Sequence, residues 1–360
     1  MYREELVKVL RVISEDKQVQ WLETDQFSKK AILYKAFTKP VQKGDVVLVN
    51  VTASLLRLGT GGYDFVRASY EKSSEHEQSE DNGHIMKLRY TPMQHSVMAI
   101  ESQESPFHSL FSEKFSLRKQ KILLAELHSM VPLVFSIAQL LHKEAKVCVI
   151  FDDQAALALS VSEHLQKLHL YERFYSITIG QAFGGMYEAT TLQTALQFAT
   201  EHLEADLVVV SVGPGVVGTG TKYGFSGIEQ AKWANVIGAL DGIPVWIPRL
   251  SFHDKRQRQQ GLSHHTRTAL FQFTYARSIL PFPEMKTSDR QLIKNQISKE
   301  NSLVEHDIVW SELKGEETII AQAFNLYGQE IKTMGRTFQD DPIFFLAVAE
   351  STKVSLGLGG

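Results

Sequence analysis

Residues 205–212 read ADLVVVSV, and residues 213–227 read GPGVVGTGTKYGFSG. The first segment is short, apolar and rich in valine, which predicts a strand that is buried on both faces of a parallel sheet. The second segment holds more glycine than a simple connection needs, and a helical pattern of apolar residues begins after it at Ile228. A strand, a glycine-rich loop and a helix in this order present backbone N–H groups and the positive end of a helix dipole, so we expect an anion site here.

The surrounding sequence alternates between strand and helix in the same way. Strands are predicted at 146–151, 174–179, 207–212 and 245–247, with helices at 154–168, 189–203 and 228–240 between them. Such alternation with short loops is typical of a doubly wound parallel sheet. We therefore assign residues 146–360 to a Rossmann-like α/β domain, in which these four strands are parallel neighbours.

The first part of the chain has a different pattern. Short strand-like segments, separated by turn residues, lie at 7–13, 18–22, 30–34, 46–52, 63–68 and 84–88. They predict an N-terminal β-rich domain over residues 1–115, either barrel-like or a sandwich. Between residues 116 and 145 the apolar residues have helical spacing around Pro132, which would kink or divide a helix. We expect linker helices there, between the two domains.

Charge and apolar runs limit the classes of function. The net charge is −3 at pH 7, so no overall basic field favours nucleic acid or an anionic membrane as a partner. Apolar runs such as 131–137 are far shorter than the roughly 18 residues of a membrane span, and the N-terminus has no apolar signal region. The single cysteine, Cys148, excludes a disulfide within the chain. These features predict a soluble cytoplasmic protein; they assign no cofactor and leave the oligomeric state open, a homo-oligomer included.

The segments that follow the four predicted strands carry carboxylates, glycines, hydroxyls and basic groups. Because ligands of open α/β sheets bind beyond the carboxyl ends of the strands, these segments together predict a site for an anionic small molecule. The predicted ligand-binding residues are Gly213, Gly215, Gly218, Thr219, Gly220, Thr221, Lys222, Arg249 and His253. The predicted catalytic groups are Asp152, Glu188, His264 and His265, and no metal ligands are assigned.

Each candidate also has a structural interpretation. Asp152 or Asp153 would serve equally as the N-cap of a following helix, and Glu188 would stabilise a first helical turn. The glycine loop would form tight turns. It is not a Walker P-loop, because Thr219 stands where that motif requires lysine, and its GxGxxxG spacing departs from the dinucleotide-binding GxGxxG.

Residues 249–267 form a basic segment that also holds three histidines. Its basic residues outnumber the lone acid, Asp254, which fits either a solvated face or anion recognition. Ser263 precedes His264 and His265 as a helix N-cap would, so the histidines would lie at the positive end of a helix. Adjacent helical residues point about 100° apart, which argues against a shared metal ion. A neutral histidine that donates a hydrogen bond or acts as general acid or base fits the pattern better.

Several longer strings carry a family resemblance. They are KGDVVLVNVTASLLRLGTGGYDFV, GQAFGGMYEA, GPGVVGTGTKYGFSGIEQ, GLSHHT and MGRTFQDDP. Together they resemble the bacterial domain of unknown function 3866 family over nearly the whole chain. The resemblance implies a cytoplasmic bacterial protein and supplies no activity, substrate or catalytic residue.

Two functions of different class follow from the residues. The first is an α/β enzyme or ligand-binding protein that holds a phosphate- or carboxylate-bearing small molecule at the strand ends. In it, Lys222 and Arg249 neutralise charge, and His264 or His265 transfers a proton. The second is a non-catalytic adaptor that binds protein or RNA through the N-terminal β domain. Aromatic residues interleaved with the cations would favour RNA binding, but Phe252 is the only aromatic residue between Arg249 and Arg267 apart from histidine. We therefore favour the first function.

Overall fold

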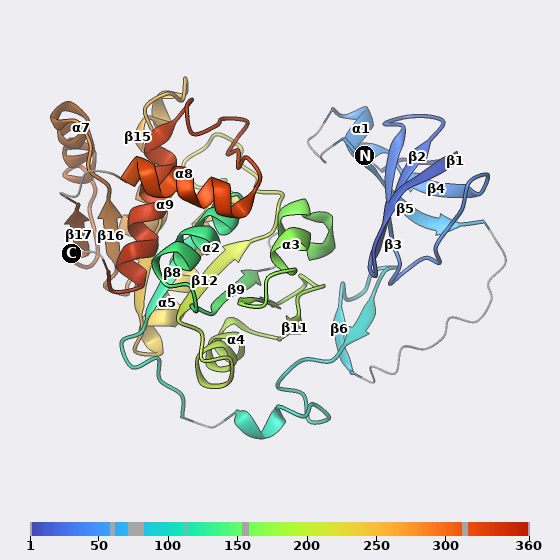
Figure 1. Ribbon diagram of the computed structural model, residues 1–360, viewed down its shortest axis with the longest axis horizontal. Helices are drawn as coiled ribbons and strands as arrows, with labels where there is room; N and C mark the ends of the chain where they lie inside the picture. The colour runs from blue at the N-terminus through green and yellow to red at the C-terminus, as the bar shows by residue number, and fades with distance from the viewer. Residues whose placement is uncertain are drawn as a thin grey trace. The chain divides into compact units, whose positions relative to one another are not determined.

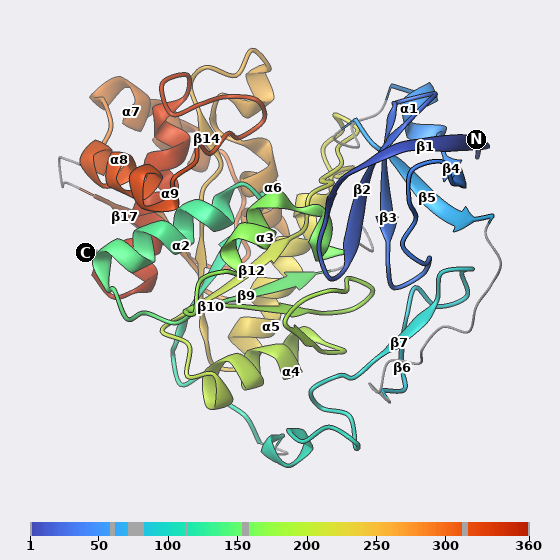
Figure 2. The same ribbon diagram turned by 45° about the vertical axis from the view of Figure 1, so that its right-hand side comes forward.

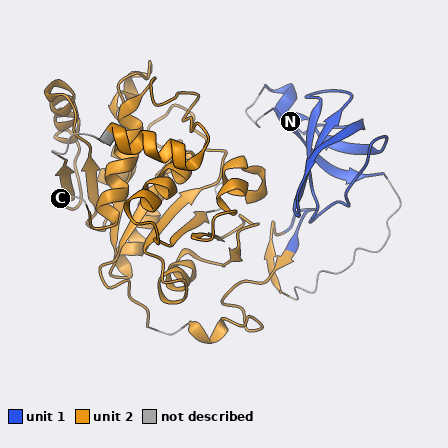
Figure 3. Cartoon of the chain, viewed as in Figure 1, with its two compact units in different colours: residues 1–82, 90–95 blue, residues 83–89, 96–360 orange. Residues whose placement is uncertain are grey.

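The computed structural model describes residues 2–57, 62–70, 83–111, 114–152, 158–311 and 316–358. The chain divides into two compact units: residues 1–82 with 90–95, and residues 83–89 with 96–360 (Figure 3). The sequence candidate Asp153 lies outside the described residues.

The first unit is a closed five-stranded β-barrel (Figure 1). Its elements are β1 (Glu4–Glu15), β2 (Val19–Thr24), β3 (Lys30–Tyr34), β4 (Val46–Asn50), the short helix α1 (Thr52–Leu55) and β5 (Asp64–Ser69). The strand order is β1-β2-β3-β5-β4, and only the β3–β5 pair is parallel. Because β4 lies beside β1 while β1, β2 and β3 follow one another, the barrel is a Greek key of the type that OB folds use. The predicted β-rich, barrel-like unit is confirmed.

The second unit is organised around an eight-stranded sheet in which every neighbouring pair of strands is parallel. The strand order is β11-β10-β9-β12-β8-β13-β16-β17. The strands are β8 (Lys121–Ala125), β9 (Val147–Asp152), β10 (Phe174–Thr178), β11 (Tyr187–Glu188), β12 (Leu207–Val212), β13 (Ile243–Trp246), β16 (Ile279–Phe282) and β17 (Asp307–Trp310). All residues of β12 are buried, as its valine-rich sequence predicts. The predicted Rossmann-like α/β class is confirmed.

Helices cover both faces of this sheet (Figures 1 and 2). One face packs against α2 (Met130–Leu141), α3 (Glu163–Leu168), α8 (Glu316–Tyr327) and α9 (Pro342–Ser355). The other face packs against α4 (Leu192–Gln197), α5 (Gln230–Ala239), α6 (His264–Phe273) and α7 (Thr287–Ile297). Shorter elements are β6 (Ile85–Lys87) with β7 (His95–Val97), β14 (Leu250–Ser251) with β15 (Gly261–Leu262), 3₁₀ turns at His108–Leu110, Leu159–Val161, Ser226–Glu229 and Gln257–Gln259, and a π turn at Phe198–His202.

The structure corrects the linker helices that the sequence predicts over residues 116–145. Residues Lys121–Ala125 form strand β8, and only α2 of this region is helical. β8 pairs with β12 on one side and β13 on the other, so those two predicted strands are parallel but are not neighbours. The second compact unit accordingly includes residues 96–145, which the sequence divided between the N-terminal domain and the linker.

The connections around β8 create a crevice at the carboxyl edge of the sheet. After β8 the chain crosses to β9 through α2 on one face, whereas after β12 it crosses to β13 through α5 on the opposite face. The loops after these two adjacent strands therefore diverge. A ligand site is expected at such a switch point in an open α/β sheet.

Candidate functional site

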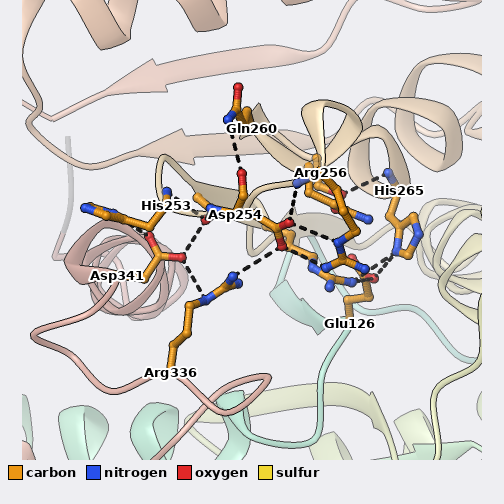
Figure 4. Close-up of polar contacts among 12 residues, drawn as sticks. Glu126, His253, Asp254, Arg256, Gln260, His265, Arg336 and Asp341 are labelled. Atoms are coloured by element: carbon orange, nitrogen blue, oxygen red, sulfur yellow. Dashed lines mark hydrogen bonds and ion pairs between the residues drawn. The ribbon is translucent and has the colours of Figure 1, made fainter.

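The side chain of Glu126 is buried directly after β8, in this crevice, and two basic side chains converge on it (Figure 4). Its Oε1 atom lies 2.7 Å from Nη1 of Arg249 and 2.7 Å from Nδ1 of His265. Arg249 follows β13, and His265 lies in the first turn of α6. Three segments that are far apart in the sequence thus meet at one carboxylate.

Local structure fixes the orientation of this cluster. Ser263 caps α6 as the sequence predicts, because its side chain accepts a hydrogen bond from the backbone N–H of His265 at 3.1 Å. The ring of Phe225 stacks on the ring of His265, with centroids 4.0 Å apart and planes 4° apart. Gly227 lies against Glu126, since a Cβ atom there would come within 3.0 Å of the Glu126 Cγ atom. A larger residue at this turn would displace the carboxylate.

The electrostatics keep Glu126 charged. Burial raises the pKa of its carboxyl group. The positive charge of Arg249 and the hydrogen bond from His265 lower this pKa by more than burial raises it, so the result is about 2. A carboxylate only accepts hydrogen bonds, so Nδ1 of His265 carries the proton that points to Glu126. Within the described residues the second carboxylate oxygen, Oε2, is buried and has no hydrogen-bond partner.

A cavity of about 240 Å³, the first cavity, opens beside this cluster. Its walls are Glu126, Val216, Val217, Gly218, Gly220, Ser226, Gly227, Arg249, Arg256, Arg258, His265 and Met334. Three of these residues are arginines. Arg249 is paired with Glu126, and Arg256 forms two hydrogen bonds of 2.9 and 2.7 Å with the carboxylate of Asp254. In the part of the chain that the structure describes, Arg258 has no acidic partner and donates only to the carbonyl of Gly220, at 3.3 Å.

A second polar network, built around Arg336, holds the segment after β13 that carries Asp254 and Arg256 (Figure 4). Arg336 bridges two buried carboxylates, with Nη1 at 3.2 Å from Asp254 and Nε at 3.3 Å from Asp341. Asp341 also accepts a hydrogen bond of 2.6 Å from the hydroxyl of Ser251. The hydrogen bonds from Arg256, outweighing burial, hold the pKa of Asp254 well below its usual range. These contacts tie the segment after β13 to the start of α9.

The glycine loop forms tight turns, which is the structural interpretation of its sequence. It folds back on itself as a hairpin, because Gly218 bridges Phe225 and the N–H of Ser226 donates to the carbonyl of Val217. The N–H of Thr219 donates to the carbonyl of Gly224 within the same hairpin. The N–H groups of Thr219 and Ser226 are therefore used inside the loop.

The structure brings together part of the predicted site. Gly218, Gly220, Arg249 and His265 all line the first cavity. Gly220, Thr221, Lys222 and His264 line an adjoining cavity of about 290 Å³, the second cavity. The glycine loop and the histidine-containing basic segment thus lie beside each other, at the carboxyl edge of the sheet.

The other predicted residues line neither cavity. They are Gly213, Gly215, Thr219, His253, Asp152 and Glu188. His253 has an exposed side chain 3.6 Å from Asp341. Asp152 accepts a hydrogen bond of 2.5 Å from the indole N–H of Trp233. Thr219 bonds to Thr221 and Gly224 inside its hairpin.

Glu188 lies in β11, at the edge of the sheet, in a buried ion pair with Lys87 at 3.1 Å. Its other partners are the Thr178 hydroxyl at 2.8 Å and the Gly184 N–H at 2.7 Å. Burial raises the pKa of Glu188, although Lys87 opposes this. Both oxygens of this carboxylate have partners, and Glu188 lies in a strand, not in the first turn of a helix as one interpretation of the sequence had it.

Sequence reasoning missed Glu126, Phe225, Arg256 and Arg258 as members of the site. The two arginines belong to the basic segment that the sequence already marked, but nothing in that pattern distinguishes them from Lys255 or Arg267. Glu126 could be found only by recognising KILLA at residues 121–125 as a strand, since a residue directly after a strand lies at the ligand-binding edge.

The sequence pattern of the family described as "Protein of unknown function (DUF3866)" matches residues 30–352, nearly the whole chain. The chain belongs to this family. No curated protein and no solved structure matches it. None of the helices in the described part of this DUF3866 protein has the length and apolar character that a membrane crossing requires. Within the described ranges, no three or more His, Cys, Asp or Glu side chains gather so as to hold a metal ion.

We expect Lys87→Met to lower the free energy of unfolding by about 3–5 kcal/mol, because it leaves Glu188 buried without its cation. Urea unfolding at neutral pH measures this. Lys119→Met is the matched control: Lys119 forms an exposed pair with Asp241 and should cost under about 1 kcal/mol. Adding Glu188→Gln to Lys87→Met should recover part of the loss. Equal, small effects of both lysine substitutions would contradict the buried ion pair.

The lowered pKa of Glu126 predicts a dependence of stability on pH. Its folded-state pKa of about 2 lies below the ordinary value of 4.5, so its ionised form stabilises the fold above pH 4.5. That contribution is lost as the pH falls toward the folded pKa. The stability difference between wild type and Glu126→Gln should therefore narrow between about pH 5 and pH 3 in urea unfolding. The exposed Glu144→Gln serves as control; a difference that stays constant with pH would contradict the assignment.

Proposed function

We propose that this DUF3866 protein binds an anionic small molecule, carrying a phosphate or carboxylate group, in the first cavity. The observation that carries the proposal is the guanidinium of Arg258, which lines the cavity and has no acidic partner among the described residues. The charges of Arg249 and Arg256 are balanced by Glu126 and Asp254, so Arg258 leaves the cavity with a positive charge. Hydrogen bonds between a guanidinium and a carboxylate or phosphate are short and strong.

His265 gives the same cavity a group that can transfer a proton. Because Nδ1 donates to Glu126, the unprotonated nitrogen of the neutral ring is Nε2, which can accept a hydrogen bond or a proton. This supports an enzyme that uses His265 as general acid or base on the bound anion. The cytoplasmic, bacterial setting belongs to the proposal and rests on the family resemblance.

Larger cavities elsewhere fit an anion less well. The cavity of about 660 Å³ lies at the amino ends of β13 and β16, where the cation Arg277 is already paired with Asp307. The cavity of about 740 Å³ is lined by Glu284, Asp289 and Glu317. The adaptor function of the N-terminal β domain stays a prediction, because the contacts described above do not test it.

Arg258→Ala should weaken the binding of inorganic phosphate or a small carboxylate such as citrate. Loss of one hydrogen bond to a charged group costs about 1.5–3 kcal/mol, roughly a ten- to hundredfold weaker affinity. Isothermal titration calorimetry measures it, after a thermal-shift screen of phosphates and carboxylates has chosen the probe. Arg277→Ala, outside the cavity, should bind as wild type does. The proposal fails if wild type binds no probe, or if Arg258→Ala binds the chosen probe unchanged.

A further inference from the structure

The second cavity adjoins the first one, and both have Gly220 and Arg258 in their walls. The remaining walls of the second cavity are Thr221, Lys222, His264, Arg267, Thr268, Gln272 and Glu300. The turn at Gly220 has a φ of +80°, and a Cβ atom there would lie 3.1 Å from Nη1 of Arg258. Glycine therefore allows the guanidinium to lie directly on the backbone of the loop, between the two spaces.

The second cavity also carries net positive charge. Lys222 lies over the ring of Tyr223 at 5.4 Å and has no acidic partner in the described ranges. Arg267 is balanced by Glu300 at 3.0 Å. Lys222, with the shared Arg258, is thus available to a second anionic group.

His264 adds an imidazole ring to the wall of the second cavity. Its ring nitrogens are buried and have no close hydrogen bond; their one polar contact is a loose one to the backbone of Arg258. Burial and the neighbouring His265 lower the pKa of His264 to about 4, so the ring is neutral at neutral pH and carries one N–H donor. A buried polar group that is poorly hydrogen-bonded costs free energy, and a better-placed acceptor oxygen in the second cavity would recover it.

We infer that the two cavities form one site for a molecule with two anionic groups, such as a diphosphate, with one group in each cavity and Arg258 between them. This inference rests on the proposed function and specifies its ligand. The two cavities, of about 290 and 240 Å³, share Gly220 and Arg258 in their walls, so one ligand can contact the same guanidinium from both. A guanidinium has five N–H donors in a plane, so Arg258 can serve acceptors on both sides.

The test compares inorganic phosphate, pyrophosphate and tripolyphosphate by isothermal titration calorimetry at one pH and ionic strength. We expect pyrophosphate or tripolyphosphate to bind at least tenfold more tightly than phosphate, because phosphate has one anionic group and occupies only the first cavity. Lys222→Ala removes a cation from the second cavity only. It should abolish this advantage and leave the affinity for phosphate within twofold of wild type.

Lys232→Ala is the matched control for charge, because Lys232 is exposed and paired with Glu229 on α5. It should leave all three affinities unchanged. If phosphate binds but the longer anions bind no more tightly, or if Lys222→Ala and Lys232→Ala weaken them equally, the two-group site is wrong and the single-anion site stands. If no anion binds, the proposed function itself is wrong.

Discussion

The carboxylate of Glu126 is the constraint on which the site depends. A charge removed from water costs several kcal/mol unless opposite charges and hydrogen bonds replace the lost solvation. Arg249 and His265 supply that replacement, and both must be in place at once. The end of β8, the segment after β13 and the first turn of α6 are thereby held together. The parallel sheet makes this feasible, because its strand order brings these segments to one edge.

The same constraint changes the role of individual arginines. Arg249 is the obvious anion ligand in the sequence, yet its guanidinium is engaged by Glu126, and its removal would leave a buried charge unpaired. Arg258 looks like a solvated residue of a basic run, yet it lines both cavities. An apolar cluster of similar volume would stabilise the fold as well as a buried ion pair does, or better. The ion pair of Glu126 with Arg249 therefore does not by itself show that stability requires it.

The sequence predicted the fold class, the barrel strands and strands β9, β10, β12 and β13 of the sheet, because these segments have clear apolar patterns and turn residues at their ends. It missed β8, since KILLA is rich in helix-forming residues and is followed closely by the apolar pattern of α2. That error concealed Glu126, which on a helix would have been one more surface acid. The hairpin of the glycine loop was beyond prediction too, because glycine content shows that tight turns occur but not which N–H groups they use.

Two buried carboxylates of similar chemistry show how geometry separates a structural role from a functional one. Glu188 has a partner on each oxygen: the Gly184 N–H on Oε1, and the Thr178 hydroxyl with Lys87 on Oε2. Glu126 receives both of its partners on Oε1, while Oε2 has none among the described residues although Glu126 lines a cavity. Both oxygens of Glu188 are thus occupied, whereas the unpartnered Oε2 of Glu126, at a cavity wall, favours a donor such as a hydroxyl or ammonium group. In a ligand of the proposed kind, a hydrogen-bond donor close to the anionic group would pair with Oε2 of Glu126.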